Sequence, residues 1–188
     1  MKFGLLTAIL EGTTFEEAVD FAAENQLECL EVACWPNTGG AKRRYAGVCH
    51  IDAEALTEEK AKEIIQYCKE RNVEISSLEK RKQYIDHIYA LIDASSMLNV
   101  NMVTTFLGRV PDKNVEENLE IVKEVWPPIL EYAKEKGVKI AIENCPMWFT
   151  ADEWPGGQNL MTSPENWRKV FEVLPYDNLG LNYDPSHF

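Results

Sequence analysis

The chain has 188 residues, 45% of them hydrophobic and 27% charged, so it can bury a substantial core and is not a disordered or low-complexity protein. Its 31 acidic residues outnumber 19 basic ones, and the formal net charge of −12 repels phosphate backbones and argues against nucleic-acid binding. No apolar run approaches the roughly 20 residues that cross a bilayer, and Glu11 interrupts the N-terminal apolar stretch too early for a signal peptide. We therefore expect neither a membrane nor a nucleic acid as a partner.

The expected elements alternate between short β-like runs and longer helix-like runs. In chain order they are strand 2–8, helix 13–25, strand 29–33, helix 57–71, strand 73–78, helix 80–98, strand 101–106, helix 115–136, strand 139–143, a helix that opens at Ser163-Pro164-Glu165, and strand 179–184. Thr13 or Thr14 can cap the first helix, and Ser163 the last. Pro127-Pro128 must kink or divide the fourth helix.

Six β/α steps without a hairpin signal predict parallel strands joined by crossover helices, in an open doubly wound sheet or a (β/α) barrel. No strand–helix turn contains a G-x-G-x-x-G or G-x-x-x-x-G-K-[ST] motif, so the familiar modes of nucleotide binding are not indicated. Acidic residues stand instead at the ends of strands, where barrels carry their active sites: Glu31, Glu143 and Asp184. The pattern favours a barrel.

The cysteine pattern is typical of a cytoplasmic protein with reduced thiols. The number of cysteines is odd, and no C-x-x-C pair occurs, so neither a disulfide framework nor a zinc ribbon is indicated. One cysteine, Cys145, lies two residues after Glu143. We expect it to be a small buried hydrophobic residue and not a nucleophile.

Two stretches, 140–144 and 181–188, carry the candidate chemistry. Each places a carboxylate, Glu143 or Asp184, where an apolar strand ends, and such a group is costly to bury unless it is paired or binds a metal. The two carboxylates could hold a divalent cation, with His187 binding the metal or a substrate oxygen. Alternatively, they pair with Lys or Arg or cap the following loop. The residues alone leave both interpretations open.

The motifs Ile-Glu-Asn at the fifth strand and Asn-Tyr-Asp-Pro-Ser-His at the sixth resemble the xylose isomerase-like TIM-barrel superfamily. This superfamily includes sugar and sugar-phosphate isomerases and epimerases, inosose dehydratases and the endonuclease IV type of AP endonuclease. The stretches 2–5, 30–36 and 75–78 are similar to its sugar isomerase/epimerase branch. The resemblance covers essentially the whole chain and implies a (β/α)8 TIM barrel. Such a barrel typically needs about 250 residues, so residues 1–188 are expected to form a single incomplete domain without its last two β/α units.

The resemblance also implies an activity, a cofactor and roles for three residues. The protein would be a metal-dependent isomerase or epimerase of a sugar, sugar phosphate or polyol, using Mn²⁺, Mg²⁺, Co²⁺ or Zn²⁺ to polarise a carbonyl and acidify the adjacent C–H. Glu143 is similar to the family's first metal ligand, which also exchanges the substrate proton, and Asp184 to its second. His187 resembles the histidine that contacts substrate near the metal. Another His and a second catalytic Glu are expected beyond Phe188.

Three further residues are candidates for contact with the substrate. Trp35 could stack on a sugar face, or it could simply pack in the barrel. His50 could reach the substrate from the long connection after the second strand, or it could be a solvated loop residue. Arg109 could hold a substrate phosphate. A fourth residue, His87, lies within a predicted helix and is expected to be structural.

Two other functions remain as alternatives. The first is a catalytically inactive barrel that binds a sugar or a partner protein. The second, less favoured, is an AP endonuclease, because the family's nucleases use histidines after the third and fourth strands and the stretches 76–79 and 104–108 contain none. The aromatic residues Trp148, Phe149 and Trp154 are expected to form a lid or an oligomer contact, and homodimers are common in the resembled family.

Overall fold

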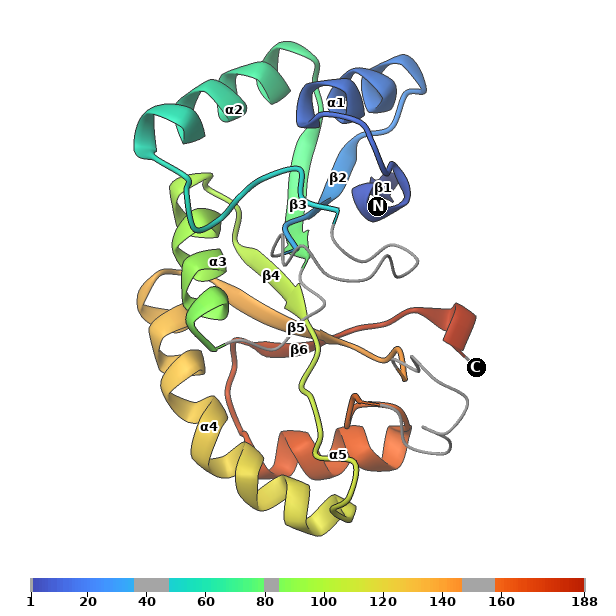
Figure 1. The fold of residues 1–188 in the computed structure, drawn as a ribbon, viewed down its shortest axis with the longest axis vertical. Helices are drawn as coiled ribbons and strands as arrows, with labels where there is room; N and C mark the ends of the chain where they lie inside the picture. The colour runs from blue at the N-terminus through green and yellow to red at the C-terminus, as the bar shows by residue number, and fades with distance from the viewer. Residues whose placement is uncertain (1, 36–47, 80–84, 147–157, 188) are drawn as a thin grey trace. The chain divides into compact units, whose positions relative to one another are not determined.

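The computed structural model describes residues 2–35, 48–79, 85–146 and 158–187 (Figure 1). The chain forms two compact units, the first made of Met1–Val103 with Lys136–Val138 and the second of Thr104–Glu135 with Lys139–Phe188. Strands and helices alternate in both units, as the sequence predicts. Among the described helices, none has the length and apolarity that a bilayer-spanning segment needs.

The first unit consists of parallel strands with helices packed against them. Its elements are β1 (Gly4–Leu6), the 3-10 turn η1 (Thr7–Ile9), α1 (Phe15–Glu24), β2 (Cys29–Ala33), α2 (Glu58–Glu70), β3 (Glu74–Glu79), α3 (Ile85–Met97) and β4 (Met102–Thr105), which ends in the second unit. Strand β2 pairs in parallel with β1 on one side and with β3 on the other. Helix α1 contacts β2, whereas α2 and α3 contact β3.

Helices α1 and α2 begin where side-chain caps satisfy their first backbone N–H groups. Of the two candidates, Thr14 is the cap of α1, because its hydroxyl accepts from the backbone N–H of Glu17 while the Glu17 carboxylate accepts from the N–H of Thr14. Thr57 caps α2 by accepting from the N–H of Lys60.

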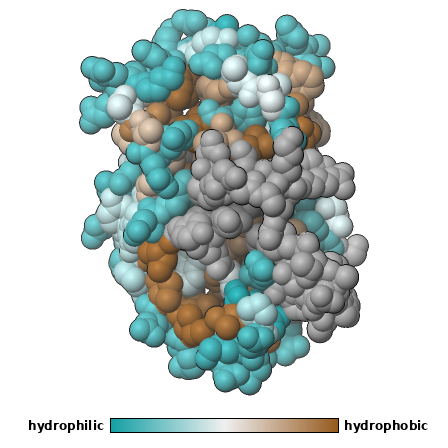
Figure 2. All heavy atoms as spheres, viewed as in Figure 1, coloured by the Kyte–Doolittle hydropathy of each residue, from teal (hydrophilic) through white to brown (hydrophobic). Residues whose placement is uncertain are grey.

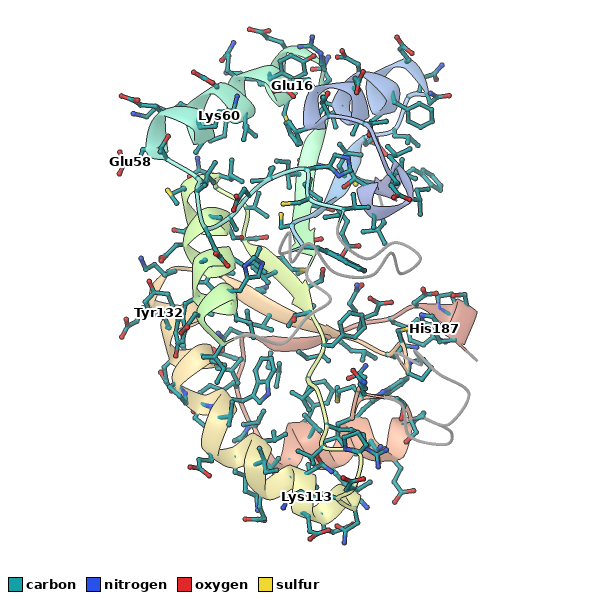
Figure 3. All side chains as sticks on the ribbon, viewed as in Figure 1. Glu16, Glu58, Lys60, Lys113, Tyr132 and His187 are labelled. Atoms are coloured by element: carbon teal, nitrogen blue, oxygen red, sulfur yellow. The ribbon has the colours of Figure 1, made fainter. Side chains whose placement is uncertain are left out.

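Hydrophilic side chains cover most of the visible surface around both helices (Figure 2). A weak surface ion pair, Lys60 Nζ to Glu16 Oε1 at 3.9 Å, links α2 to α1 (Figure 3).

The buried residue His87 has the structural role that its place in a helix predicts. It lies on α3, and its side chain is 4% exposed. Its Nδ1 is 2.6 Å from a carboxylate oxygen of Glu54, and its Nε2 is 3.0 Å from the carbonyl oxygen of Cys34. The imidazole therefore ties α3 to two connections of the first unit, with both ring nitrogens engaged.

The second unit is built from two β/α steps. Its elements are α4 (Val115–Glu135), β5 (Lys139–Glu143), α5 (Pro164–Val173), β6 (Leu179–Asn182) and the 3-10 turn η3 (Pro185–His187). Strands β5 and β6 pair in parallel, with Glu143 opposite Asn182. Helix α4 contacts both β5 and α5, and the two helices lie on the same side of this strand pair (Figure 1). Ser163 caps α5 as predicted, and Pro164 is its first residue.

Helix α4 continues through its two prolines, so of the two expected effects, a kink or a division, the division does not occur, and the kink stays a prediction. Pro127 and Pro128 remove the helical hydrogen bonds to the carbonyls of Lys123 and Glu124. Both of those residues are exposed, so water can satisfy the two freed carbonyls. Buried residues on both sides of the prolines, among them Trp126 and Ile129, pack the helix into the unit and hold it together.

Most element ends differ from the expected ones by one or two residues, and three of the differences are instructive. Strand β1 stops at Leu6 because the buried hydroxyl of Thr7 turns to accept from the backbone N–H of Ala33, at 2.9 Å. Strand β6 stops at Asn182 because the N–H of Asp184 bonds a side chain and not a neighbouring strand. Helix α3 is described from Ile85, and the expected start at 80–84 lies outside the described residues.

Two strand glycines give a test of the β1–β2 packing. A Cβ built on Gly4 would lie 2.6 Å from both the carbonyl oxygen and the Sγ of Cys29, whereas one on Gly180 would meet nothing within 4 Å. We expect Gly4→Ala to lower the free energy of unfolding by about 1–3 kcal/mol through overpacking. The matched change Gly180→Ala should stay within about 0.5 kcal/mol of the wild type. Urea unfolding measures both, and equal losses would contradict the close approach at Gly4.

Candidate functional site

The structure brings two predicted site residues, Glu143 and His187, into contact within the second unit. Glu143 is the last residue of β5 and follows three buried strand residues, so its side chain is only 8% exposed. His187 lies on η3, beyond the end of β6 (Figure 3). Its Nε2 is 3.4 Å from Oε1 of Glu143. Strands β5 and β6 are parallel neighbours, so their C-terminal ends lie side by side. The residues that follow β6 therefore lie next to the end of β5.

The third predicted residue, Asp184, lies on the other side of the same imidazole nitrogen. Its Oδ2 is 3.4 Å from Nε2 of His187. Its Oδ1 accepts a hydrogen bond of 2.8 Å from the backbone N–H of Ser186, so this carboxylate also caps the turn that carries His187. The sequence offered two roles for Asp184, a cap for the following loop and a member of a site with His187. The structure is compatible with both, because the carboxylate caps the turn and also lies beside His187.

A side chain that the sequence did not single out, Asn144, ties the two strand ends together. Its Oδ1 accepts from the backbone N–H of Asp184 at 2.7 Å, and its Nδ2 donates to the carbonyl of the same residue at 2.9 Å. The Asn144 side chain is almost completely buried, at 1% exposure. This two-bond clamp takes the place of a further strand pair and positions Asp184 relative to Glu143.

A second buried amide, Asn159, holds the backbone on both sides of Asn144. Its Nδ2 donates to the carbonyl of Glu143 at 2.7 Å and to that of Cys145 at 2.8 Å. Its Oδ1 accepts from the N–H of Met161, and the residue is fully buried. No local pattern predicts its two donated bonds, because the two carbonyls that it binds lie 14 and 16 residues earlier in the chain.

Cys145 is the functional candidate that sequence reasoning set aside. We expected a buried hydrophobic residue, but Cys145 is only half-buried. One donor atom each from Glu143, Cys145 and His187 lie within 4.8 Å of one another. Residues two apart in extended backbone point to the same side, so the Glu-x-Cys spacing was a signal that could have identified it.

The aromatic residue before Asp184 is fixed from a neighbouring helix. The Tyr183 ring makes an edge-to-face contact with Trp167 of α5, with 6.2 Å between ring centroids. The Nε1 of Trp167 donates in turn to the carbonyl of Met161 at 2.7 Å. Tyr183 nevertheless remains 57% exposed, so the contact orients the ring without enclosing it.

Two of the minor candidates lie in the first unit. Trp35 is 6% exposed and packs in a small cluster with Ala8, Ala33 and Val48, which is the packing role considered for it. His50 is half-buried, and its Nε2 is 3.2 Å from the hydroxyl of Thr13. Burial lowers the pKa of His50 below its usual value, because the charged imidazole loses solvation. A contact of either residue with substrate stays a prediction.

The last minor candidate, Arg109, lies in the second unit, after Gly108, which adopts a positive φ of 79°. Its Nη2 donates to the carbonyl of Lys113 at 3.4 Å. Its Nε is buried and has no hydrogen-bond partner among the described residues. The predicted phosphate contact of Arg109 is not tested by this arrangement. The aromatic residues proposed as a lid, Trp148, Phe149 and Trp154, lie outside the described residues.

The residues at the end of β5 and β6 fit a divalent metal ion. Carboxylate and imidazole ligands bind zinc at about 2.0–2.2 Å, so two of them on one tetrahedral ion lie about 3.3 Å apart. The observed distance between Glu143 Oε1 and His187 Nε2, 3.4 Å, is close to this value. All the donors come from the second unit, and the main one is a buried carboxylate of the kind that requires a partner.

A family model described as "Xylose isomerase-like TIM barrel" matches residues 19–188 of the chain. No curated protein sequence matches this chain significantly. Solved structures share its fold at low sequence identity. The probable 3-DHS dehydratase AsbF from Bacillus anthracis has a TM-score of 0.73 and 18% identity, and a D-psicose 3-epimerase determined in the presence of D-fructose has 0.75 and 11%. The IolI protein with a binding zinc atom has a TM-score of 0.71 and 17% identity.

In each of these three comparisons, the match covers 100% of this chain but 64% of the other. The chain thus spans about two thirds of the length of the solved structures that it resembles. Its similarity to them concerns the arrangement of the backbone, and their chemistry is a separate question.

The clamp between Asn144 and Asp184 can be tested by stability. Asn144→Ala removes two hydrogen bonds and leaves both backbone groups of Asp184 without these partners, so we expect a loss of about 2 kcal/mol in the free energy of unfolding. Asn101→Ala, at an exposed asparagine, is the control and should change stability by less than about 0.5 kcal/mol. Urea unfolding of both variants measures the difference, and a neutral Asn144→Ala would show that the clamp is dispensable.

The lowered pKa of His50 predicts a specific pH dependence. The unfolded state binds the proton more readily than the folded state, so His50 stabilises the fold fully above its unfolded pKa of 6.5 and loses this contribution as the pH falls through its lower folded pKa. We expect His50→Gln to reduce the loss of stability between about pH 7.5 and about pH 5. Urea unfolding at both pH values measures the slope, and an unchanged slope would contradict this prediction.

Proposed function

Since the chain belongs to the xylose isomerase-like TIM-barrel family, we propose that it is a metal-dependent isomerase or epimerase of a sugar, sugar phosphate or polyol. One observation carries the proposal: the buried carboxylate of Glu143 ends a parallel strand and lies 3.4 Å from Nε2 of His187, where a barrel has its active site. The D-psicose 3-epimerase determined with D-fructose supports the substrate class.

The metal ligands that we propose are Glu143 and Asp184, with His187 beside them to bind the cation or a substrate oxygen. A divalent cation, Mn²⁺, Mg²⁺, Co²⁺ or Zn²⁺, would polarise a substrate carbonyl and acidify the C–H next to it. IolI, which has the same fold, was determined with a bound zinc atom, and this supports a divalent ion as the cofactor. The short separations of both carboxylates from His187 support the same choice of ligands.

Glu143 is the proposed acid/base. A carboxylate oxygen of Glu143 would take the proton from the substrate carbon. Return of that proton to the neighbouring carbon would move the carbonyl, whereas inversion of a centre requires a second acid, the Glu expected beyond Phe188, to deliver a proton to the opposite face. The 8% exposure of the Glu143 side chain limits competition from water for that oxygen. His187 is more open, with 24% of its side chain exposed, and can hydrogen-bond a substrate oxygen.

The other residues of the site would act by positioning. Asn144 connects the end of β5 to Asp184, and Asp184 in turn holds the N–H of Ser186 in the turn that carries His187. The spacing between the acid/base and the imidazole thus depends on buried hydrogen bonds and not on exposed loops. A site that must place a proton within hydrogen-bonding reach requires such support.

The proposed partner is a small molecule, and the net charge of −12 argues against a nucleic acid. All five cysteines are free of disulfides, which supports the proposal that the protein is cytoplasmic. A homodimer is proposed from the resemblance to the family alone.

Exchange of substrate protons with solvent tests the proposed reaction. In deuterated water with a divalent cation, the full-length protein should introduce deuterium into at least one member of a panel of ketoses, ketose phosphates and inososes. Glu143→Gln should reduce this exchange by at least about 100-fold, since general acid–base groups contribute factors of 10² to 10⁴. Glu135→Gln, at an exposed glutamate of α4, is the matched control and should retain the exchange.

The possible outcomes separate the proposed enzyme from its alternative. Exchange that requires both the cation and Glu143 supports the isomerase or epimerase. Sugar binding by calorimetry without any exchange would overturn the proposal and favour an inactive sugar-binding barrel. Exchange that persists in Glu143→Gln would show that another residue moves the proton.

A further inference from the structure

We propose that the thiolate of Cys145 is a further protein ligand of the metal, in addition to Glu143, Asp184 and His187, so that the site selects zinc-like cations over magnesium and manganese. This inference rests on the metal centre of the proposed function and adds a ligand and a metal preference to it. The observation behind it is the group of three donor atoms, a carboxylate oxygen, a sulfur and an imidazole nitrogen, that lie within 4.8 Å of one another.

The donor separations are close to those of a bound ion. At a Zn–S distance of about 2.3 Å and Zn–O or Zn–N distances of about 2.0–2.1 Å, the ligand atoms of a tetrahedral site lie about 3.3–3.6 Å apart. The Glu143–His187 pair, at 3.4 Å, already has this spacing. The sulfur must therefore approach by no more than about 1.3 Å, which a rotation about χ1 of a half-buried cysteine can supply.

The backbone around the three donors is held by the two buried amides. Asn159 binds the carbonyls of Glu143 and Cys145 with one nitrogen, so the peptide segment that carries two of the donors is fixed. Asn144, between those two residues, holds the main chain of Asp184, from which the turn with His187 begins. Ligands that are already held in place favour metal binding, because a freely moving side chain would lose conformational entropy when the ion binds.

The chemistry of the donors determines which ion the site prefers. Magnesium and manganese favour carboxylate, carbonyl and water oxygens, whereas a thiolate beside an imidazole suits zinc, cobalt or copper. On binding, Cys145 releases its thiol proton to solvent, and the sulfur lone pair forms the bond to the cation without any change of oxidation state.

Titration with Co²⁺ tests this inference directly, because a cobalt–thiolate bond gives an intense near-ultraviolet absorption that oxygen and nitrogen ligands do not give. We expect the full-length protein to show this absorption, Zn²⁺ to abolish it at stoichiometric amounts, and excess Mg²⁺ to leave it unchanged. Cys145→Ser should lose the absorption and bind Zn²⁺ at least about 10-fold more weakly, which is the smallest loss typical even of outer-shell changes. Cys49→Ser, at an exposed cysteine, is the matched control and should keep both properties.

A second measurement does not depend on the folding of a variant. In the wild-type protein, Zn²⁺ should slow the alkylation of Cys145 by iodoacetamide, and Mg²⁺ should not. Peptide mass spectrometry reports the extent of the reaction, with Cys49 as an internal control whose rate should not respond to either cation. Equal protection by the two cations, or none, would overturn the proposed thiolate ligand.

The results distinguish a failure of this inference from a failure of the proposed function. Co²⁺ binding without the thiolate absorption, lost in Glu143→Gln but unchanged in Cys145→Ser, would overturn the role of Cys145 and leave the metal-dependent enzyme intact. The thiolate absorption without sugar-proton exchange would support the ligand but overturn the isomerase. No Co²⁺ binding by the folded protein would overturn both.

Discussion

The candidate site depends on one interaction, the pair of hydrogen bonds between the Asn144 side chain and the backbone of Asp184. The amide offers one donor and one acceptor, which match the carbonyl and the N–H of a single residue as a neighbouring strand would. Parallel strands β5 and β6 end at Glu143 and Asn182, and beyond these ends no strand pair can fix the chain. The clamp supplies that constraint one residue beyond β5, where the acidic residues stand.

The burial of Glu143 determines what the site can bind. A carboxylate that is 8% exposed at the end of an apolar strand has a high cost of desolvation unless an opposite charge, a hydrogen-bond donor or a cation compensates it. His187 approaches Glu143 and Asp184 alike, at 3.4 Å from each, and Cys145 completes a group of donors on the same unit. These donors all come from the ends of β5 and β6 and the residues that follow them, which belong to the second unit.

Strands and helices with strong local signals were predictable, and the details of the site were not. Strands 29–33 and 139–143 were predicted with their observed bounds, because buried parallel strands are continuous apolar runs. The sequence left open whether Pro127-Pro128 kink or divide α4, and the helix is not divided, because local propensity yields to the packing of buried residues around the prolines. The roles of Asn144 and Asn159 were missed, since each depends on a partner that lies elsewhere in the chain, whereas Cys145 was set aside despite its local spacing from Glu143.

The sequence by itself determined the alternation of strands and helices, the family, and the positions of Glu143 and Asp184 at the ends of strands, because periodicity, caps and short motifs are local properties. Only the tertiary structure decided which side chains meet. It brought His187 to Glu143 across 44 residues, placed Cys145 beside both, and assigned Trp35 to a packed cluster. Such contacts follow from how the strands pair and where buried amides hold the backbone, and these constraints act between residues that are distant in the chain.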